Sequence, residues 1–161
     1  MFKSSSTKKH FGIAPLHVND SATLHQIHQH CFIPAWGKRT FDTFLTDHSI
    51  FGYKVFLIHP SDQILGFCLC RLILDEAEII TIAVHPHYRQ QGIGTLLIDH
   101  TIRHLHDKRA IKLFLEVESS NLSALILYQR FEFQKISERL AYYRSKNGRG
   151  DAIIMQKLLS K

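Results

Sequence analysis

Cysteine is scarce in this chain of 161 residues, which contains only Cys31, Cys68 and Cys70. So small and odd a number excludes the disulfide framework that stabilises many small secreted proteins. Cys68 and Cys70 are two residues apart in a predicted strand, so their side chains share one face and suit a hydrophobic core. The sequence has no Cys-x-x-Cys or His-Glu-x-x-His motif, and we therefore expect no metal site.

Long hydrophobic runs are also missing. No apolar segment approaches the length of a membrane span, and the basic N-terminal segment lacks the apolar centre of a secretory signal. We therefore expect a cytoplasmic protein with no membrane partner, in which residues 1–11 are flexible. With 45% hydrophobic and 21% charged residues, the chain is typical of a single globular domain spanning residues 1–161.

Acidic residues are fewer than basic ones, 14 against 20, which leaves a net charge of +6. A basic protein suits acidic partners such as phosphate groups, RNA or a ribosome surface. The basic residues are scattered, however, and no aromatic pattern typical of RNA-binding domains accompanies them. Ordinary surface charge explains them at least as well, and we expect no direct nucleic-acid recognition.

Histidine, by contrast, is abundant, with twelve residues. His25 and His28 share one helical face, as do His100 and His104. A zinc site needs three or four convergent ligands. Solvated helix faces therefore explain these pairs better than a metal.

Hydrophobic periodicity and turn residues predict the order of elements. A strand is expected near Gly12–Val18, with helices over Ser21–Cys31, capped by Asp20, and over Lys38–Leu45. The later expected segments are strands at 50–59, 64–74, 76–84 and 111–118, helices at 93–107 and 121–131, and closing strands at 133–143 and 151–159 around the loop 144–150. This order predicts an α/β protein with a mixed, mostly antiparallel central sheet flanked by helices.

A glycine-containing loop joins the predicted buried strand Ile79–Val84 to an amphipathic helix. The first N–H groups of a helix have no internal partner and lie at the positive end of its dipole, so they suit an anion such as a phosphate. Taken alone, Gly92 and Gly94 are better explained by a tight turn. The spacing excludes a Rossmann fingerprint, because Leu97 stands where a small residue is needed, and it excludes a P-loop, which needs Gly-Lys-Ser/Thr.

Three polar side chains follow this loop at suggestive positions. Glu116 lies near the end of a hydrophobic strand, Asn121 begins the next helix, and Tyr128 lies two turns later on the same stripe. Each alone has a structural explanation, as an edge-strand glutamate, an N-cap and a core tyrosine. Together, behind the glycine loop, they indicate one site.

The runs TIAVHPHYRQQGIGTLLIDHTI, LFLEVESSNLSALILYQRFEF and RLAYYRSKNGRGDAIIM resemble the GCN5-related N-acetyltransferase (GNAT) superfamily, which uses acetyl-coenzyme A. They are similar in particular to the RimI type, which acetylates the N-terminal alanine of a small-subunit ribosomal protein. The similarity covers nearly all of residues 74–158. It implies the GNAT fold, acetyl-coenzyme A as co-substrate without a metal, and a ribosomal or other protein N-terminus as partner.

The resemblance also implies the roles of individual residues. Glu116 would be the general base and Tyr128 the general acid of acetyl transfer. The implied cofactor-binding residues are Ile82, Ala83, Val84, Arg89, Gln90, Gln91, Gly92, Ile93, Gly94 and Asn121. Two alternatives stay open: acetylation of a small amine or a lysine side chain, and a non-catalytic module that binds acetyl-coenzyme A or the ribosome.

Two further positions carry expectations. Relatives usually have a glycine where this chain has Glu132, directly after the helix expected at 121–131. The backbone at that position is expected to be left-handed, a conformation in which a side chain is unfavourable. Asp75 and Glu76 precede a strand, and contact with a basic peptide explains them about as well as solvation of a turn.

Overall fold

The computed structural model describes residues 9–145 and 148–159, which form one seven-stranded sheet in the order β1-β2-β3-β4-β5-β7-β6. The strands are β1 (Phe11–Pro15), β2 (Ile50–Leu57), β3 (Ile64–Ile73), β4 (Glu76–Val84), β5 (Lys112–Glu118), β6 (Gln134–Ser145) and β7 (Gly148–Leu158). The helices are α1 (Ser21–Cys31), α2 (Lys38–Leu45), α3 (Ile93–Asp107) and α4 (Leu122–Arg130), with short 3-10 turns η1 (Val18–Asp20) and η2 (Pro86–Tyr88). Every neighbouring pair of strands is antiparallel except β4 and β5. The predicted mixed, mostly antiparallel α/β sheet is confirmed.

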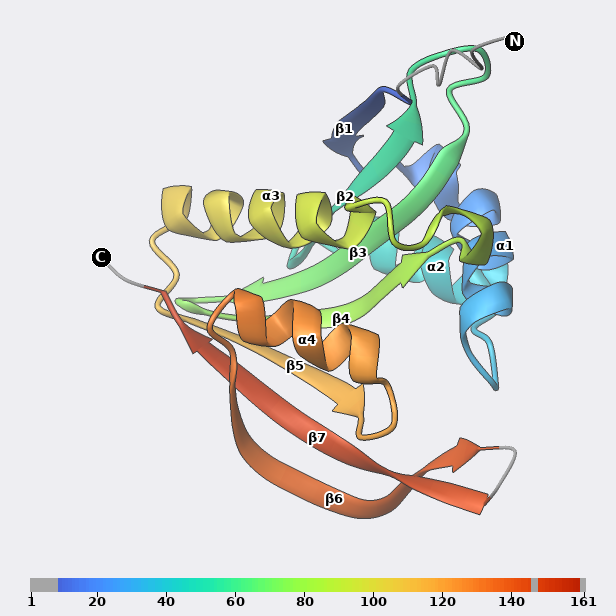
Figure 1. Ribbon diagram of the computed structural model, residues 1–161. Coiled ribbons are helices and arrows are strands. Elements are labelled where there is room, and N and C mark those ends of the chain that lie inside the picture. The colour runs from blue at the N-terminus through green and yellow to red at the C-terminus, as the bar shows by residue number, and fades with distance from the viewer. Residues whose placement is uncertain (1–8, 146–147, 160–161) are drawn as a thin grey trace, which may run out of the picture.

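Helices cover both faces of the sheet, and each face has its own core (Figure 1). On one face α3 buries the predicted apolar stripe, including Leu97 and Leu105, against the sheet. Cys68 and Cys70 lie fully buried in this same core, 3.6 Å apart between their sulfur atoms, as expected for small core residues. On the other face α1 and α2 enclose a smaller core that contains Phe67.

The parallel pair β4 and β5 separates soon after it begins. Within the described residues its pairing runs only from Glu76 opposite Lys112 to Glu78 opposite Phe114. Beyond that point the two strands diverge, and α4 lies over the place where they part (Figure 1). The ladder between β3 and β4 shifts at the same level, because Leu69 pairs with Thr81 and Cys70 with Ile79. This leaves Ile80 as the extra residue of a β-bulge, which bends and twists a strand.

Helices α3 and α4 end in the same way. At the end of α4, Phe133 N–H donates to Tyr128 C=O (3.0 Å) and Glu132 N–H donates to Gln129 C=O (3.0 Å), which is the Schellman pattern. Glu132 is left-handed, with φ of 64°, as expected from the glycine that relatives usually have there. Arg109, with φ of 59°, takes the equivalent position after α3.

We expect Glu132→Gly to raise the melting temperature by about 2 to 6 °C, because a left-handed side chain costs about 1–2 kcal/mol and a domain of this size shifts by about 2–4 °C per kcal/mol. The ion pair that is lost, from Glu132 to Lys157 at 3.6 Å, involves a glutamate side chain that is 87% exposed and contributes little. Thermal unfolding followed by circular dichroism measures the shift. Arg130→Gly, two residues earlier at the right-handed last position of α4, should lower the melting temperature instead. A lower value for Glu132→Gly would contradict the prediction.

Several element boundaries differ from expectation. The first strand ends at Pro15, and Val18 belongs to the turn η1. Asp20 occupies the N-cap position of α1, as predicted, but its side chain makes no capping hydrogen bond to the helix. Its carboxylate instead accepts hydrogen bonds from His17 N–H (2.7 Å) and from Lys54 Nζ (2.8 Å), which lies 34 residues later in β2.

The chain ends also need correction. The final loop, predicted over 144–150, is shorter, because β6 extends to Ser145 and β7 begins at Gly148. Of the N-terminal segment 1–11 expected to be flexible, residues 1–8 lie outside the described residues, and Phe11 already belongs to β1.

We expected the paired histidines to lie on solvated helix faces, but two of them do not. His28 is buried, stacks on Phe32 and Trp36 with ring centroids 4.3 and 4.8 Å apart, and accepts a hydrogen bond from Trp36 N–H (3.1 Å). Burial lowers the pKa of His28 to about 4, so the ring is neutral at physiological pH. His104 is half-buried at 2.9 Å from the Tyr53 hydroxyl, and burial lowers its pKa as well. Packing explains both side chains.

Candidate active site

The glycine loop leads from β4 to the first turn of α3. Gln90 and Gly92 both have left-handed backbones, with φ of 62° and 81°. The helix begins at Ile93, and its first backbone hydrogen bond runs from Leu96 N–H to Gly92 C=O (3.1 Å). No side chain of the described residues caps this end of α3. The first N–H groups of the helix therefore have no capping side chain, and their binding of an anion stays a prediction.

The two glycines serve different purposes. Gly92 has open space where a Cβ atom would be, so its positive φ, rather than crowding, favours glycine there. At Gly94 a Cβ atom would lie 3.0 Å from Leu127 Cδ2, so the glycine allows the start of α3 to pack closely against α4. Each glycine thus has a structural reason of its own, and close approach of a phosphate stays a prediction.

Arg89 joins the loop to the end of β4. Its Nε donates to Val84 C=O at 3.3 Å, and its terminal nitrogen lies 3.5 Å from Cys31 Sγ at the end of α1. Val84 and Ile82 pair on one side with Gly66 and Cys68 of β3. Because β4 has left β5 by this level, its other edge faces the gap between the two strands. Backbone groups of residues 82–84 along that edge can bind an extended ligand.

Glu116 and Tyr128 lie on opposite faces of the sheet. Leu115 and Val117 are buried in the same core as Tyr128, beneath α3 and α4. Since side chains alternate along a strand, the half-buried Glu116 points to the face that carries α1 and α2. Tyr128 is only 4% exposed, and its ring packs edge-to-face on Phe133 at 5.7 Å. Glu116 thus lies on β5 beyond its last pair with β4, and Tyr128 is buried on the other face, beneath the helix that covers the place where the strands part.

Asn121 has a structural role that the sequence also suggested. Its Oδ1 accepts a hydrogen bond from Ala124 N–H (3.3 Å), which makes it the N-cap of α4. Its backbone N–H donates to Glu118 C=O (2.9 Å), which closes the turn from β5 into the helix. The predicted contact of Asn121 with the cofactor is untested by this arrangement.

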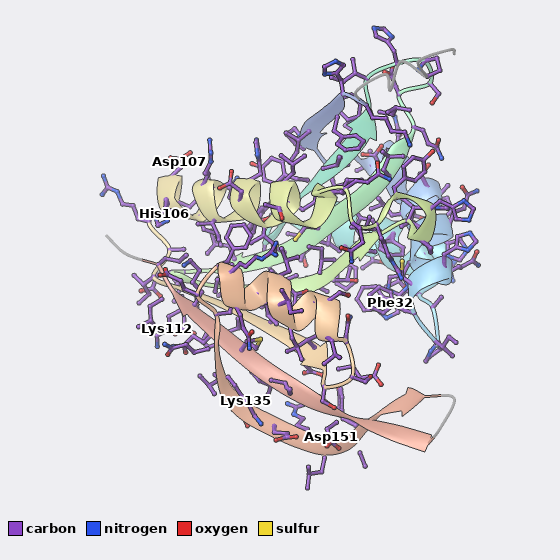
Figure 2. All side chains as sticks on the ribbon, in the orientation of Figure 1. Phe32, His106, Asp107, Lys112, Lys135 and Asp151 are labelled. Carbon is purple, nitrogen blue, oxygen red and sulfur yellow. The ribbon has the colours of Figure 1, made fainter. Side chains whose placement is uncertain are left out.

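Asp75 and Glu76 lie at the beginning of β4, where the sheet is still fully paired. Glu76 forms an ion pair with Lys112 at 3.4 Å. Figure 2 shows Lys112 at the opposite end of the sheet from Phe32, which follows the end of α1. Both acidic residues line a groove of about 450 Å³ whose wall includes Phe114. Because Phe114 is two residues before Glu116 on β5, the groove opens on the same face as that carboxylate. Contact of Asp75 and Glu76 with a peptide stays a prediction.

One polar residue of this region was missed by the sequence analysis. Thr81 lies in β4 just after the bulge, and it is 6% exposed. No hydrogen-bond partner is found for its hydroxyl oxygen among the described residues. Its only signal in the sequence is that it interrupts the apolar run IITIAV.

No three histidine, cysteine, aspartate or glutamate side chains within 9–145 and 148–159 are placed to hold a metal ion. No helix in these ranges is long and apolar enough to cross a membrane.

Two features of the site can be compared with known proteins: a parallel strand pair that separates early, and a helix N-terminus without a capping side chain. Residues 21–133 match the Acetyltransferase (GNAT) family, and the chain belongs to this family. It is 33% identical over 143 residues to the [ribosomal protein bS18]-alanine N-acetyltransferase of Escherichia coli strain K12, covering 89% of this chain and 94% of that protein. It is 32% identical over 140 residues to a putative enzyme of the same name from Bacillus subtilis strain 168, covering 87% and 90%.

Solved structures agree with these relatives. The crystal structure of the ribosomal-protein-S18-alanine N-acetyltransferase from Escherichia coli has a TM-score of 0.86 at 31% identity, and covers 94% of this chain and 96% of that chain. Arabidopsis thaliana NAA60 in complex with acetyl-CoA has a TM-score of 0.84 at 19% identity, with 93% and 99% covered, and supports the fold alone. The predicted GNAT fold and the resemblance to the RimI type are confirmed.

Proposed function

We propose that this chain transfers the acetyl group of acetyl-coenzyme A to the α-amino group of a protein N-terminus, and that its substrate is the N-terminal alanine of ribosomal protein bS18, the substrate for which its relatives are named. The observation that supports the proposal is that Glu116, on β5 beyond its last pair with β4, and Tyr128, on α4, lie on opposite faces of the sheet. The gap between β4 and β5 admits an acyl donor between an acceptor amine on one face and a proton donor on the other. A ribosomal substrate places this enzyme in the cytoplasm.

The backbone supplies most of the cofactor site in this proposal. The free edge of β4 at Ile82–Val84 binds the pantetheine arm and the acetyl carbonyl by main-chain hydrogen bonds, as an added strand would. The N–H groups at the start of α3, with the loop Arg89–Gly94, bind the pyrophosphate. Asn121 lies at the start of α4, on the other side of the gap, and completes the site. A main-chain N–H of β4 also stabilises the oxyanion that forms on the acetyl carbonyl.

The chemistry follows from the two side chains. An α-amino group has a pKa of about 8, so about a tenth to a quarter is already unprotonated near neutral pH, whereas a lysine side chain, at about 10.4, is almost wholly charged. A carboxylate acting through a water molecule is a sufficient base for the α-amine. Glu116 takes this proton as the nitrogen attacks the thioester carbonyl carbon, and Tyr128 protonates the departing thiolate as the carbon–sulfur bond breaks.

The experiment that tests this function compares three peptides carrying the N-terminal sequence of bS18. One begins with free alanine, one with free serine, and one has a blocked N-terminus but keeps its internal lysines. After incubation with the protein and acetyl-coenzyme A, intact-mass analysis should show one added acetyl group on the free alanine peptide and none on the blocked peptide. A protein carrying both Glu116→Gln and Tyr128→Phe controls for spontaneous acetylation. Acetylation of internal lysines alone would show that the acceptor is a side chain and would refute the proposal.

A further inference from the structure

The hydroxyl of Thr81 is the starting point, because it is buried where a hydroxyl is costly. Thr81 is 6% exposed, and no hydrogen-bond partner is found for its oxygen within the described ranges. Buried polar groups in folded proteins nearly always have a partner, so a buried hydroxyl without one calls for an explanation. Valine has the same shape and would avoid the cost.

The bulge at Ile80 decides which way Thr81 points. Before it, Ile79 faces the core beneath α3 and α4, and an unbroken strand would turn Thr81 to that same face. After it, Ile82 packs against that core, whereas Ala83 belongs to the core beneath α1 and α2. Thr81 alternates with Ile82 and therefore shares the face of Ala83. The extra residue thus moves the hydroxyl onto the face of the sheet that carries Glu116.

Thr81 and Glu116 also lie at the same height along the gap. The last paired residues of the two parallel strands are Glu78 and Phe114. Glu116 is two residues beyond Phe114. Thr81 is three residues beyond Glu78, but one of these three is the extra bulge residue Ile80, so both strands advance by two paired positions. The two side chains therefore lie on the same face of the sheet and at the same level, one on each side of the gap between β4 and β5.

We propose that the Thr81 hydroxyl positions the water molecule through which Glu116 removes a proton from the attacking amine, an assignment that rests on the proposed function. A bound water needs two to four polar partners. A hydroxyl both donates and accepts hydrogen bonds, whereas an ionised carboxylate only accepts. Thr81, Glu116 and the amine together supply three partners on one face of the gap.

The proton balance of the step is complete with these groups. The amine nitrogen forms its bond to the acetyl carbon while its proton passes to the water, which gives a proton to the Glu116 carboxylate. Thr81 holds the water throughout and neither gains nor loses a proton overall. The carbon–sulfur bond then breaks, and the thiolate takes the proton of Tyr128. Exchange with solvent restores both side chains.

The test compares Thr81→Val with Thr81→Ser on the alanine peptide. The valine variant should lose about 10-fold or more in kcat, since a displaced reacting group costs on that order, and should keep its KM for acetyl-coenzyme A. Its melting temperature should be unchanged or higher, because the buried hydroxyl without a partner is gone. The serine variant, which keeps the hydroxyl, should retain most of the wild-type kcat.

Two further comparisons separate positioning from packing. Thr101→Val is the matched control, because Thr101 also has a buried hydroxyl but lies on α3 in the opposite core, beside the Cys70 thiol, and its kcat should match wild type. In a Glu116→Gln background, Thr81→Val should cause no further loss, since the water then serves no base. A wild-type kcat for Thr81→Val, an equal loss in Thr81→Ser, or a full additional loss in the Glu116→Gln background would overturn the assignment. A wild-type protein that does not acetylate the peptide would instead refute the proposed function itself, and this assignment with it.

Discussion

Replacing Glu116 by glutamine is expected to lower kcat on an alanine peptide by about 10²-fold or more, the usual scale for a positioned proton-transfer group. Glutamine keeps the shape of the side chain and its place on β5, but its amide cannot take up a proton. The KM for acetyl-coenzyme A should change little, because Glu116 points to the face opposite α3 and α4.

Glu118→Gln is the matched control for this variant. Glu118 is the same residue type, lies two residues later on the same strand and face, and is also half-buried. Glu118 lies further along β5 than the level of Thr81, however, and its side chain packs beside Gly150 of β7. Steady-state rates from pH 5 to 9 on both variants distinguish a specific base from a general loss of negative charge. Equal losses in the two variants would remove Glu116 from its proposed role.

Replacing Tyr128 by phenylalanine is also expected to lower kcat by about 10²-fold or more, because the thiolate must then leave without a proton from the enzyme. The change removes one oxygen atom and keeps the aromatic ring, so the edge-to-face contact with Phe133 should persist. The Schellman hydrogen bond from Phe133 N–H goes to the backbone carbonyl of Tyr128 and is also unaffected. Affinity for acetyl-coenzyme A, measured by calorimetry, should stay close to that of the wild type.

Tyr53→Phe provides the comparison. The Tyr53 hydroxyl lies on β2 and contacts His104 of α3, away from the gap, so its loss should affect stability more than turnover. If Tyr128→Phe retains the wild-type kcat while Tyr53→Phe behaves as expected, the proton donor is a different group or water.

The sequence predicted most of the elements because their patterns are local. The apolar stripe of α3, the alternation in β5 and the buried pair Cys68 and Cys70 depend on periods of a few residues, and the structure confirms them. The left-handed conformation of Glu132 was also predicted, from the glycine that relatives usually have at this position.

Contacts between distant segments were not predictable in this way. Asp20 suits an N-cap by its type and position, but Lys54 from another strand binds its carboxylate. His28 was expected in solvent because its helical neighbours are polar, whereas Trp36 and Phe41, beyond a loop, enclose it. Locally, the side-chain period of two put Glu116 opposite its hydrophobic neighbours but could not show that Tyr128 lies on the other face.

The candidate site has the same division. Arg89, Gly92 and Gly94 were found because they belong to a linear motif. Glu116 and Tyr128 were found from their positions in one predicted strand and one predicted helix. Thr81 has no such motif, because its direction depends on a bulge that is visible only in the register between β3 and β4. One extra residue in a strand changes the face of every side chain that follows it, and no hydrophobic pattern over six residues reveals that change.

The early separation of β4 and β5 also leaves a strand edge whose hydrogen-bonding another molecule can complete. A ligand bound along the open edge of β4, as proposed for acetyl-coenzyme A, acts as the missing strand and favours the folded state by mass action, about 2.7 kcal/mol at a hundred times its dissociation constant. That amount is a substantial fraction of the stability of an ordinary domain, about 5–15 kcal/mol. The lifetime of such an enzyme against unfolding and proteolysis would then follow the supply of its own acetyl donor, so that a cell short of that metabolite would hold less of the enzyme as well as less of its substrate.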